Sequence, residues 1–431
     1  MSVPAPSSAG PPPAAARRAA NRHAPKRRQG AAFWLVAVTF AAAMAFSTVP
    51  SPLYALYQAQ DHFSAFTVTI VFAVYAVGVV ASLLLAGHVS DWVGRKRVLI
   101  SAIALEVLAA VVFAVWPQVA GLLVARFVTG LGVGMLTATA TAYLHDLHRL
   151  TRPGQGTGRF EIVSSAANIG GLGLGPLLAG ALAQFAPEPL LTPYVLFAIA
   201  LLLSVIAISV SPETVVPPPE RPRYRPQRIS VGQGAHTRYL AAAGAAFSAF
   251  AIYGLFTSLA AGFVEGTLGV SNHLVIGAVI FVMFAASALA QIASGWLPPG
   301  SRLAVGIVAE ALGLVVLALG MEGASLVLFL IGAAIAGLGA GVLFKTAIGT
   351  VSRLATERTR GESLAGLFLI AYLGLIGPVV GLGVATQFLP ELTALLWFTG
   401  ALLAVLVAVA VVARIGSRRP RLVRVLESEG R

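Results

Sequence analysis

The chain has 431 residues, of which 58% are hydrophobic and 10% are charged, and its mean hydropathy is +0.87. This composition excludes an ordinary soluble domain, and the absence of cysteine excludes disulfides, thiolate nucleophiles and Cys-ligated metal centres. The formal net charge of +13 would suit a nucleic-acid partner. However, the basic residues flank apolar segments, as orientation-setting charges do, so no nucleic-acid partner is predicted.

Apolar segments recur along the chain, each close to the about 20 residues that a helix needs to cross a bilayer. Lipid cannot satisfy open backbone groups, so each segment is predicted to be a helix and the fold an all-α integral membrane protein. The twelve predicted transmembrane helices cover residues 32–56, 65–89, 97–116, 119–146, 160–185, 192–211, 239–262, 272–297, 303–321, 325–350, 362–387 and 391–414.

Charge alternates between the loops that join these segments. One set of loops and both tails carry all the lysine and arginine clusters, whereas the opposite set carries only the acids Asp61, Glu188, Glu265, Glu322 and Glu391. The positive-inside rule therefore predicts that both termini lie in the cytoplasm, which requires an even number of spans. The predicted location is the cell membrane, crossed many times.

The hydrophilic segments predict the domain boundaries. Residues 1–30 are rich in proline, alanine and arginine, which predicts a disordered basic cytoplasmic tail. Residues 212–238 form a proline-rich basic segment, predicted to be a cytoplasmic linker. It separates a six-helix bundle at 31–211 from a second at 239–414, and residues 415–431 are a second basic cytoplasmic tail.

The two halves repeat each other in sequence. GLGVG at 130–134 returns as GLGAG at 337–341, and GLGPLLAG at 173–180 returns as GLIGPVVGLG at 374–383. The segment around Glu106 returns around Glu310. All three offsets are about 205 residues, and parallel six-span repeats of this kind are typical of transporters. Two pseudo-symmetric six-helix bundles are therefore predicted.

The loop after the second predicted span, GHVSDWVGRKR at 87–97, resembles the most characteristic motif of the major facilitator superfamily of secondary transporters. The matching positions are Gly87, Asp91, Gly94, Arg95, Lys96 and Arg97. Gly94 permits a tight turn, Asp91 can face the positive end of a neighbouring helix, and the basic run anchors the loop. The resemblance implies a latch between the two halves in the outward-facing state. The alternative is a charged turn that only obeys the positive-inside rule.

Three charged residues inside predicted spans are candidates for proton coupling. Arg126 begins RFVTGLGVG, which is similar to the superfamily motif in which a buried arginine takes part in coupling; the alternative is a structural tie between helices. Glu106 lies at a similar depth and could pair with Arg126, which would leave it ionised and largely structural. Glu310 is the counterpart of Glu106 in the second half, where the counterpart of Arg126 is Ala333. Burial without a nearby cation favours the neutral form of Glu310, and we expect it to be protonated in one transport state. A neutral, purely structural Glu310 is the alternative.

The fifth predicted span carries Gly171, Gly175, Pro176 and Gly180, which resemble the superfamily motif associated with antiporters. Small residues four apart let helices approach closely, and the proline bends the span. Ile162 and Ala179 depart from the pattern, and ordinary small-residue packing is the alternative.

Polar and aromatic residues inside the spans are candidates to line a central cavity. The family architecture, in which the first and fourth spans of each triplet line the cavity, favours Thr48, Tyr54, Tyr253 and Thr257 as substrate contacts. Asn168, Ser248 and Lys345 are further candidates. Local hydrogen bonding is the alternative role for most of them.

The predicted function is secondary active transport by alternating access, with efflux of small amphipathic molecules coupled to protons. The alternatives are a proton-linked symporter for sugars or organic acids and a non-transporting membrane sensor or scaffold. No Walker loop and no catalytic trio is present, so no enzyme is predicted. The predicted partners are a small-molecule substrate, protons and the lipid bilayer; a monomer with no metal and no cofactor is expected.

Overall fold

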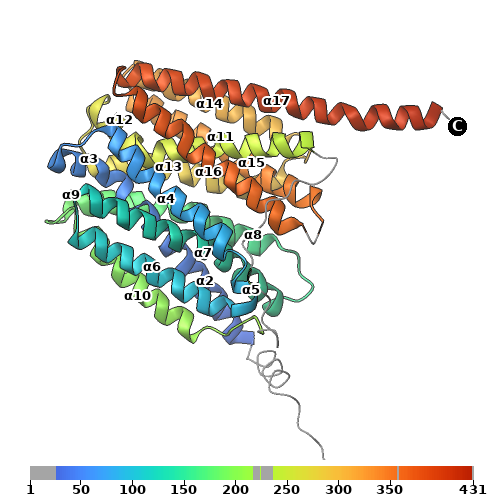
Figure 1. The fold of residues 1–431 in the computed structure, drawn as a ribbon, viewed down its shortest axis with the longest axis horizontal. Helices are drawn as coiled ribbons and strands as arrows, with labels where there is room; N and C mark the ends of the chain where they lie inside the picture. The colour runs from blue at the N-terminus through green and yellow to red at the C-terminus, as the bar shows by residue number, and fades with distance from the viewer. Residues whose placement is uncertain (1–25, 217–223, 225–235, 357–358, 430–431) are drawn as a thin grey trace, which may run out of the picture.

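The computed structural model describes the backbone of residues 26–216, 224, 236–356 and 359–429, and the side chains of all these except 26–27 and 417–429. Most of the predicted tail at 1–30 and of the predicted linker at 212–238 lies outside the described residues. Within the described residues, twelve helical segments are long and apolar enough to cross a membrane, which confirms the predicted all-α fold. Figure 1 shows the helices of the first half on one side of the molecule and those of the second half on the other.

The bounds of the helices follow the apolar segments closely. The first half contains α2 (Lys26–Thr48), α3 (Pro50–Asp61), α4 (Ala65–Ala86), α5 (Ser90–Val93), α6 (Arg95–Val115), α7 (Val119–Thr151), α8 (Gly158–Ser165), the π-helical turn η1 (Ala166–Gly170), α9 (Gly171–Phe185) and α10 (Thr192–Val210). The second half contains α11 (His236–Ser258), α12 (Ala260–Gly266), α13 (His273–Ala293), the 3-10 turn η2 (Ser294–Trp296), α14 (Arg302–Glu322), α15 (Leu326–Leu354), α16 (Arg360–Ala385) and α17 (Glu391–Glu429).

The last helix differs most from its predicted bounds. A basic tail was expected from residue 415, but α17 continues to Glu429 and extends beyond the bundle (Figure 1). Hydropathy marks where the apolar stretch ends, whereas a helix continues for as long as its backbone hydrogen bonds do.

The first span of each half is broken near one end. In the first half, Pro50 has no N–H for the carbonyl of Phe46, which instead accepts from the Val49 N–H at 3.1 Å, and α3 starts at Pro50. In the second half, the hydroxyl groups of Thr257 and Ser258 donate back to the helix carbonyls, and α11 ends there. Such back-bonding bends helices. The two halves therefore share a break at corresponding places.

Glycines of the fourth span of each half confirm the internal repeat. On α7, Gly130 and Gly134 face α4, and Gly132 faces Glu106 on α6. On α15, the equivalent glycines repeat these contacts: Gly337 and Gly341 face α13, and Gly339 faces Glu310 on α14. In both halves the missing side chains let three helices approach closely.

The most extensive contacts between the halves are made by two helix pairs, α9 with α13 and α4 with α16. Gly180 of α9 lies against the backbone of His273 and Gly277, and Gly277 in turn lies against the carbonyl of Pro176. Gly383 of α16 lies against Thr69 of α4. Small residues at these seams keep the two bundles in close contact. At the α9–α13 seam, Oε1 of Gln184 also accepts a hydrogen bond of 3.0 Å from the backbone N–H of His273.

Replacing Gly130 with alanine is expected to lower the thermal stability of the purified protein. A Cβ there would collide with the carbonyl of Tyr75 and lie 2.9 Å from the Cα of Gly78, both of them backbone atoms. The expected cost is about 1–3 kcal/mol, typical of overpacking. The matched control is Gly400→Ala on α17, where a Cβ meets nothing within 4 Å. The packing argument is contradicted if both variants unfold at the same temperature.

Candidate functional site

A small central cavity of about 70 Å³ lies between the two halves. Its lining residues come from both halves and are aromatic, aliphatic or neutral polar; none of them is charged. The aromatic members are Phe72, Tyr75, Phe250, Tyr253, Phe284, Phe344, Phe368 and Tyr372, and the hydroxyl and amide members are Ser47, Thr48, Ser51, Thr137, Asn168 and Thr257. A ligand held here would meet ring faces and a few hydrogen-bonding groups.

The structure places three of the four expected substrate contacts in this lining: Thr48, Tyr253 and Thr257. Part of their hydrogen-bonding capacity is already used. The Thr48 hydroxyl lies 2.8 Å from the Leu172 carbonyl, the Thr257 hydroxyl donates to the Tyr253 carbonyl at 2.6 Å, and the Tyr253 hydroxyl lies 2.6 Å from that of Ser287. These bonds orient the side chains in the cavity wall.

Tyr54, the fourth expected contact, does not line the cavity. Its side chain is buried behind the wall, where the hydroxyl accepts a hydrogen bond of 2.8 Å from Nε of Arg126. The helix is interrupted at Val49, between α2 and α3, which the apolar pattern of one continuous span did not indicate. Ser248 and Lys345 also lie outside the lining, whereas Asn168 lies within it.

Arg126 lies one layer behind the cavity. Its side chain is 1% exposed, and Nη1 donates to the carbonyl of Ser47 at 2.6 Å, next to the break between α2 and α3. The guanidinium also lies over the rings of Tyr54 and Tyr75, 5.4 Å from each centroid. Ser47 and Tyr75 both line the cavity, so the guanidinium contacts the cavity wall from behind, on the side that faces away from the cavity.

The expected pair between Arg126 and Glu106 is not formed. Glu106 is fully buried against Gly132, and within the described residues neither carboxylate oxygen has a hydrogen-bond partner. Nη2 of Arg126 also has no partner there. The guanidinium points instead towards α2 and α3, where the Ser47 carbonyl accepts a hydrogen bond from Nη1 and the Tyr54 hydroxyl accepts one from Nε. Similar depth in two neighbouring spans therefore did not determine which way the two side chains point.

Glu310 occupies the repeat position in the second half. It is fully buried, and the Ser248 hydroxyl donates to Oε1, while Oε2 has no hydrogen-bond partner within the described residues. No ion pair involves Glu310 in the part of the chain that the structure describes, and Ala333 on α15 is fully buried. Burial without a cation disfavours a charged carboxylate, so this environment suits the neutral acid.

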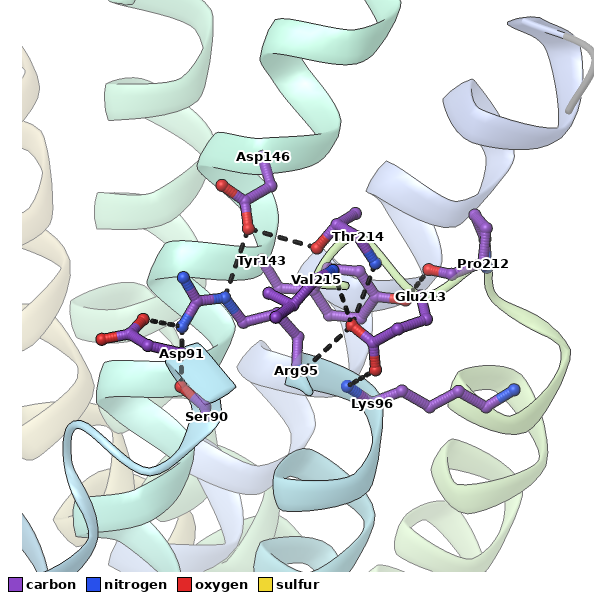
Figure 2. A network of polar contacts seen from close by, with 10 residues as sticks. All are labelled: Ser90, Asp91, Arg95, Lys96, Tyr143, Asp146, Pro212, Glu213, Thr214 and Val215. Carbon is purple, nitrogen blue, oxygen red and sulfur yellow. Dashed lines mark hydrogen bonds and ion pairs between the residues drawn. The ribbon is translucent and has the colours of Figure 1, made fainter. Parts of the chain in front are cut away.

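The conspicuous loop at 87–97 lies in a polar network at one end of the bundle, shown in Figure 2. We call this end, which carries the loops predicted to be cytoplasmic, the basic end. Gly94 has a φ of 113°, so a glycine is required at this turn. Arg95 donates to Asp91 at 2.5 Å and Ser90 at 2.7 Å through Nη1, and to Asp146 at 3.2 Å through Nε. Arg97 is exposed.

The start of the interior hydrophilic segment completes the network. Glu213 accepts hydrogen bonds of 3.0 Å from the backbone N–H groups of Arg95 and Lys96, in the first turn of α6 (Figure 2). Thr214 donates to Asp146 at 3.1 Å. A carboxylate at a helix N-terminus satisfies orphan N–H groups and complements the helix dipole. Neither Glu213 nor Asp146 was predicted to contact this loop, although an acid just after the sixth span was an available signal.

Glu213→Ala is expected to lower the free energy of unfolding by about 1 kcal/mol, the usual cost of losing a helix cap. The control is Asp91→Asn: the Asp91 side chain is 63% exposed, so its ion pair with Arg95 is screened and about 0.5 kcal/mol or less is expected. Thermal unfolding of both variants in detergent measures the difference. If Asp91→Asn costs as much as Glu213→Ala, Glu213 is not the main tie.

An ion pair between the two halves lies near the basic end. Nζ of Lys345 on α15 lies 3.6 Å from Oε2 of Glu161 on α8, and the same ammonium donates to the Gln291 carbonyl at 2.8 Å. Lys345, expected in the cavity, thus lies between the bundles.

The residues of the antiporter-like segment lie at two interfaces of α9. Gly171 and Gly175 face α2, next to Ala41 and Ala45 respectively, while Pro176 and Gly180 face α13 of the other half. Thr48 lies against Gly175, so this packing borders the cavity. A bulkier residue at the α13 face would push the bundles apart, whereas one at the α2 face would separate two helices of the first half.

Comparisons with known proteins agree with this architecture. The human organic anion transporter MFSD10 (TETRAN) has 17% sequence identity and a TM-score of 0.64, over 90% of this chain and all of that chain. A peptide transporter POT in complex with sulfate has 14% identity and a TM-score of 0.73, over 91% of this chain and 95% of that chain. At these identities the likeness shows the fold alone.

Two curated relatives match short segments. Myo-inositol transporter 2 of Schizosaccharomyces pombe is 35% identical over 86 residues, which is 20% of this chain and 15% of the relative. Multidrug resistance protein MdtL of Escherichia coli strain S88 is 42% identical over 77 residues, 18% of this chain and 20% of that protein. The matches thus span at most a fifth of either relative.

A family model covers much more of the chain. The model described as Major Facilitator Superfamily matches residues 35–304, which run from within α2 to the start of α14. The matched residues include the loop at the basic end and the glycines of α7 and α9. The chain therefore belongs to the Major Facilitator Superfamily, a family of membrane transporters rather than of enzymes.

Proposed function

We propose that this protein exports small amphipathic molecules in exchange for protons, by alternating access of the central cavity to the two sides of the membrane. The observation that carries the proposal is the lining of that cavity, which is aromatic, contains neutral hydroxyl and amide groups, and has no charged member. Such a wall suits a ligand with an apolar body and one polar or cationic group, because ring faces attract cations.

Two further features favour coupling to protons by antiport. Arg126 is buried behind the cavity wall and contacts two of its residues, and Glu310 is buried without a cation. We infer that ligand binding in the cavity and protonation of Glu310 can influence each other. The antiporter-like segment lies where α9 meets both α2 and α13. The drug relative MdtL points to the same substrate class.

A proton-linked symporter for sugars or organic acids is the second candidate. The hydroxyl and amide groups in the cavity, together with the relative named as a myo-inositol transporter, favour it. The cavity lacks a charged residue, which argues against organic acids more than against neutral sugars.

Purified protein in vesicles under an imposed pH gradient would separate these functions. Lumenal pH is recorded while lipophilic cations, neutral drugs and sugars are added singly, with protein-free vesicles as the control for passive leakage. Proton release driven by a lipophilic compound, and absent without protein, is expected. A response to sugars alone would establish the symporter, and no response to any compound would contradict both proposals.

We further propose that the basic end faces the cytoplasm of the cell and that the protein acts as a monomer. Because the chain contains no cysteine, single cysteines report orientation without a background. Glu188→Cys, in an exposed loop at the opposite end, is expected to react with a membrane-impermeant maleimide in intact cells. Arg149→Cys, exposed at the basic end, is expected to react only after permeabilisation. The reverse pattern of reactivity would show that the basic end faces the outside of the cell.

A further inference from the structure

A second pocket, much larger than the central cavity, lies within the second half at the basic end. Its volume is about 530 Å³, within the range of pockets that bind small ligands. Helices α11, α14, α15 and α17 surround it, with the turn that precedes α14. None of its lining residues belongs to the lining of the central cavity. The transport function proposed above does not use this pocket.

The charged residues that line this pocket are all cationic. They are Arg238, Arg302, Lys345, Arg353 and Arg414, and among the described residues no carboxylate lines the pocket. Arg302 is held in place by hydrogen bonds from Nε to the Leu297 carbonyl at 3.0 Å and from Nη2 to the Gly295 carbonyl at 3.3 Å. Lys345 is shared with Glu161 of the other half. Five cations from four helices concentrate positive potential in a single concavity.

The rest of the wall is apolar and reaches the outer surface of the bundle. Leu303, Ile307 and Val308 of α14 line the pocket, and Val308 is also 66% exposed. Val308 begins a row of exposed apolar side chains along one face of α14, which continues through Leu312, Val315 and Leu319. On a membrane-spanning helix such a face is the one that contacts acyl chains.

We propose that this pocket binds the phosphate-bearing headgroup of an anionic phospholipid from the leaflet at the basic end. The arginines bind the phosphate, because guanidinium groups form paired hydrogen bonds with phosphate oxygens. The acyl chains lie along the exposed face of α14 that begins at Val308. Basic pockets between transmembrane helices at the cytoplasmic side are suited to such headgroups. The location also fits the proposed orientation of the basic end.

The combination of charge and apolar surface favours a lipid over a free anion. A soluble phosphate would use only the cations and would gain nothing from the exposed valine and leucine side chains. A lipid uses both, because its phosphate lies at the depth of the helix ends while its chains occupy the hydrocarbon region. The lipid also arrives already concentrated in the membrane plane.

The test uses the full-length protein in phosphatidylcholine nanodiscs, with phosphatidylglycerol titrated into the bilayer. Thermal unfolding is expected to shift upwards with phosphatidylglycerol, and native mass spectrometry is expected to retain bound phosphatidylglycerol. Arg238→Gln combined with Arg353→Gln should weaken the apparent affinity for phosphatidylglycerol about thirtyfold. Each cation near an anionic surface contributes about fivefold in affinity, and two are removed. The control, Arg149→Gln, removes an exposed cation that is outside the pocket at the same end.

Each outcome decides the proposal. An equal loss of affinity in Arg149→Gln would mean that net charge, rather than the pocket, attracts the lipid, and would overturn it. The same thermal shift from inorganic phosphate in pure phosphatidylcholine would replace the lipid by a soluble anion. No difference between the two lipids for the wild-type protein would also overturn it. An affinity of Arg238→Lys combined with Arg353→Lys that lies between those of the wild type and the glutamine variant would support it, because the charge is kept while the paired hydrogen bonds of the guanidinium groups are lost.

Discussion

Vesicles that contain Arg126→Ala are expected to release protons no faster than protein-free vesicles when a transported compound is added. The variant removes the guanidinium that contacts the cavity wall from behind, and it leaves the Ser47 carbonyl and the Tyr54 hydroxyl without this donor. Each lost partner of a buried polar group costs about 1–3 kcal/mol, so a lower unfolding temperature accompanies the loss of transport.

A second variant separates coupling from stability. Tyr54→Phe removes one of the two hydrogen bonds of Arg126 but keeps its charge, its bond to Ser47 and its contact with the Tyr75 ring. We expect a smaller thermal shift than for Arg126→Ala, because one hydrogen bond is lost instead of two, with proton release largely retained. If Tyr54→Phe abolishes release as completely as Arg126→Ala, the effect is structural. Proton release that survives in Arg126→Ala would exclude the residue from coupling.

Glu310→Gln is expected to abolish uphill efflux driven by a pH gradient while leaving exchange of labelled for unlabelled substrate. Glutamine has nearly the same shape, stays neutral, and can still accept the hydrogen bond from Ser248, so the fold is expected to persist. It cannot bind and release a proton. Proton-driven accumulation and substrate exchange, measured on the same vesicles, report the two activities separately.

The matched control for Glu310→Gln is Glu106→Gln, at the repeat position in the first half. Both acids are fully buried and each lies against a glycine of the following span, Gly132 or Gly339. If Glu106 is structural, its variant keeps proton-driven efflux. Loss of coupling in Glu106→Gln alone would transfer the proton-carrying role to the first half. Intact efflux in Glu310→Gln would contradict the role proposed for Glu310.

The number of spans, their order and the twofold repeat could all be predicted from the sequence. The reason is physical: lipid admits only helices of a limited range of lengths, so an apolar stretch specifies its own secondary structure. The glycines at 130–134 and 337–341 were recognisable as repeats, and their contacts with equivalent helices followed. Gly94 was also recognisable, because a tight turn at a helix start has few alternatives.

The partners of the charged groups were decided by tertiary structure. Sequence indicated that Arg126 and Glu106 lie at similar depth, but the direction of each side chain depends on how α7 is rotated against α2, α3 and α6. The position of Tyr54 behind the cavity depends on the break before Pro50. Glu213 reaches α6 from more than a hundred residues away along the chain, a contact that no local pattern encodes.

Hydropathy and glycine spacing, read in short segments of the sequence, by themselves determined the membrane-spanning helices, their order and the repeat of this protein. Only the packed structure decided which residues line the cavity, where Arg126 directs its hydrogen bonds, and that five cations of the second half surround one pocket. The features read from the sequence depend on the free energy of transfer of each side chain from water to lipid, which is a property of short segments. Those decided by the packed structure depend on helix rotation and on contacts between distant segments, which are properties of the whole fold.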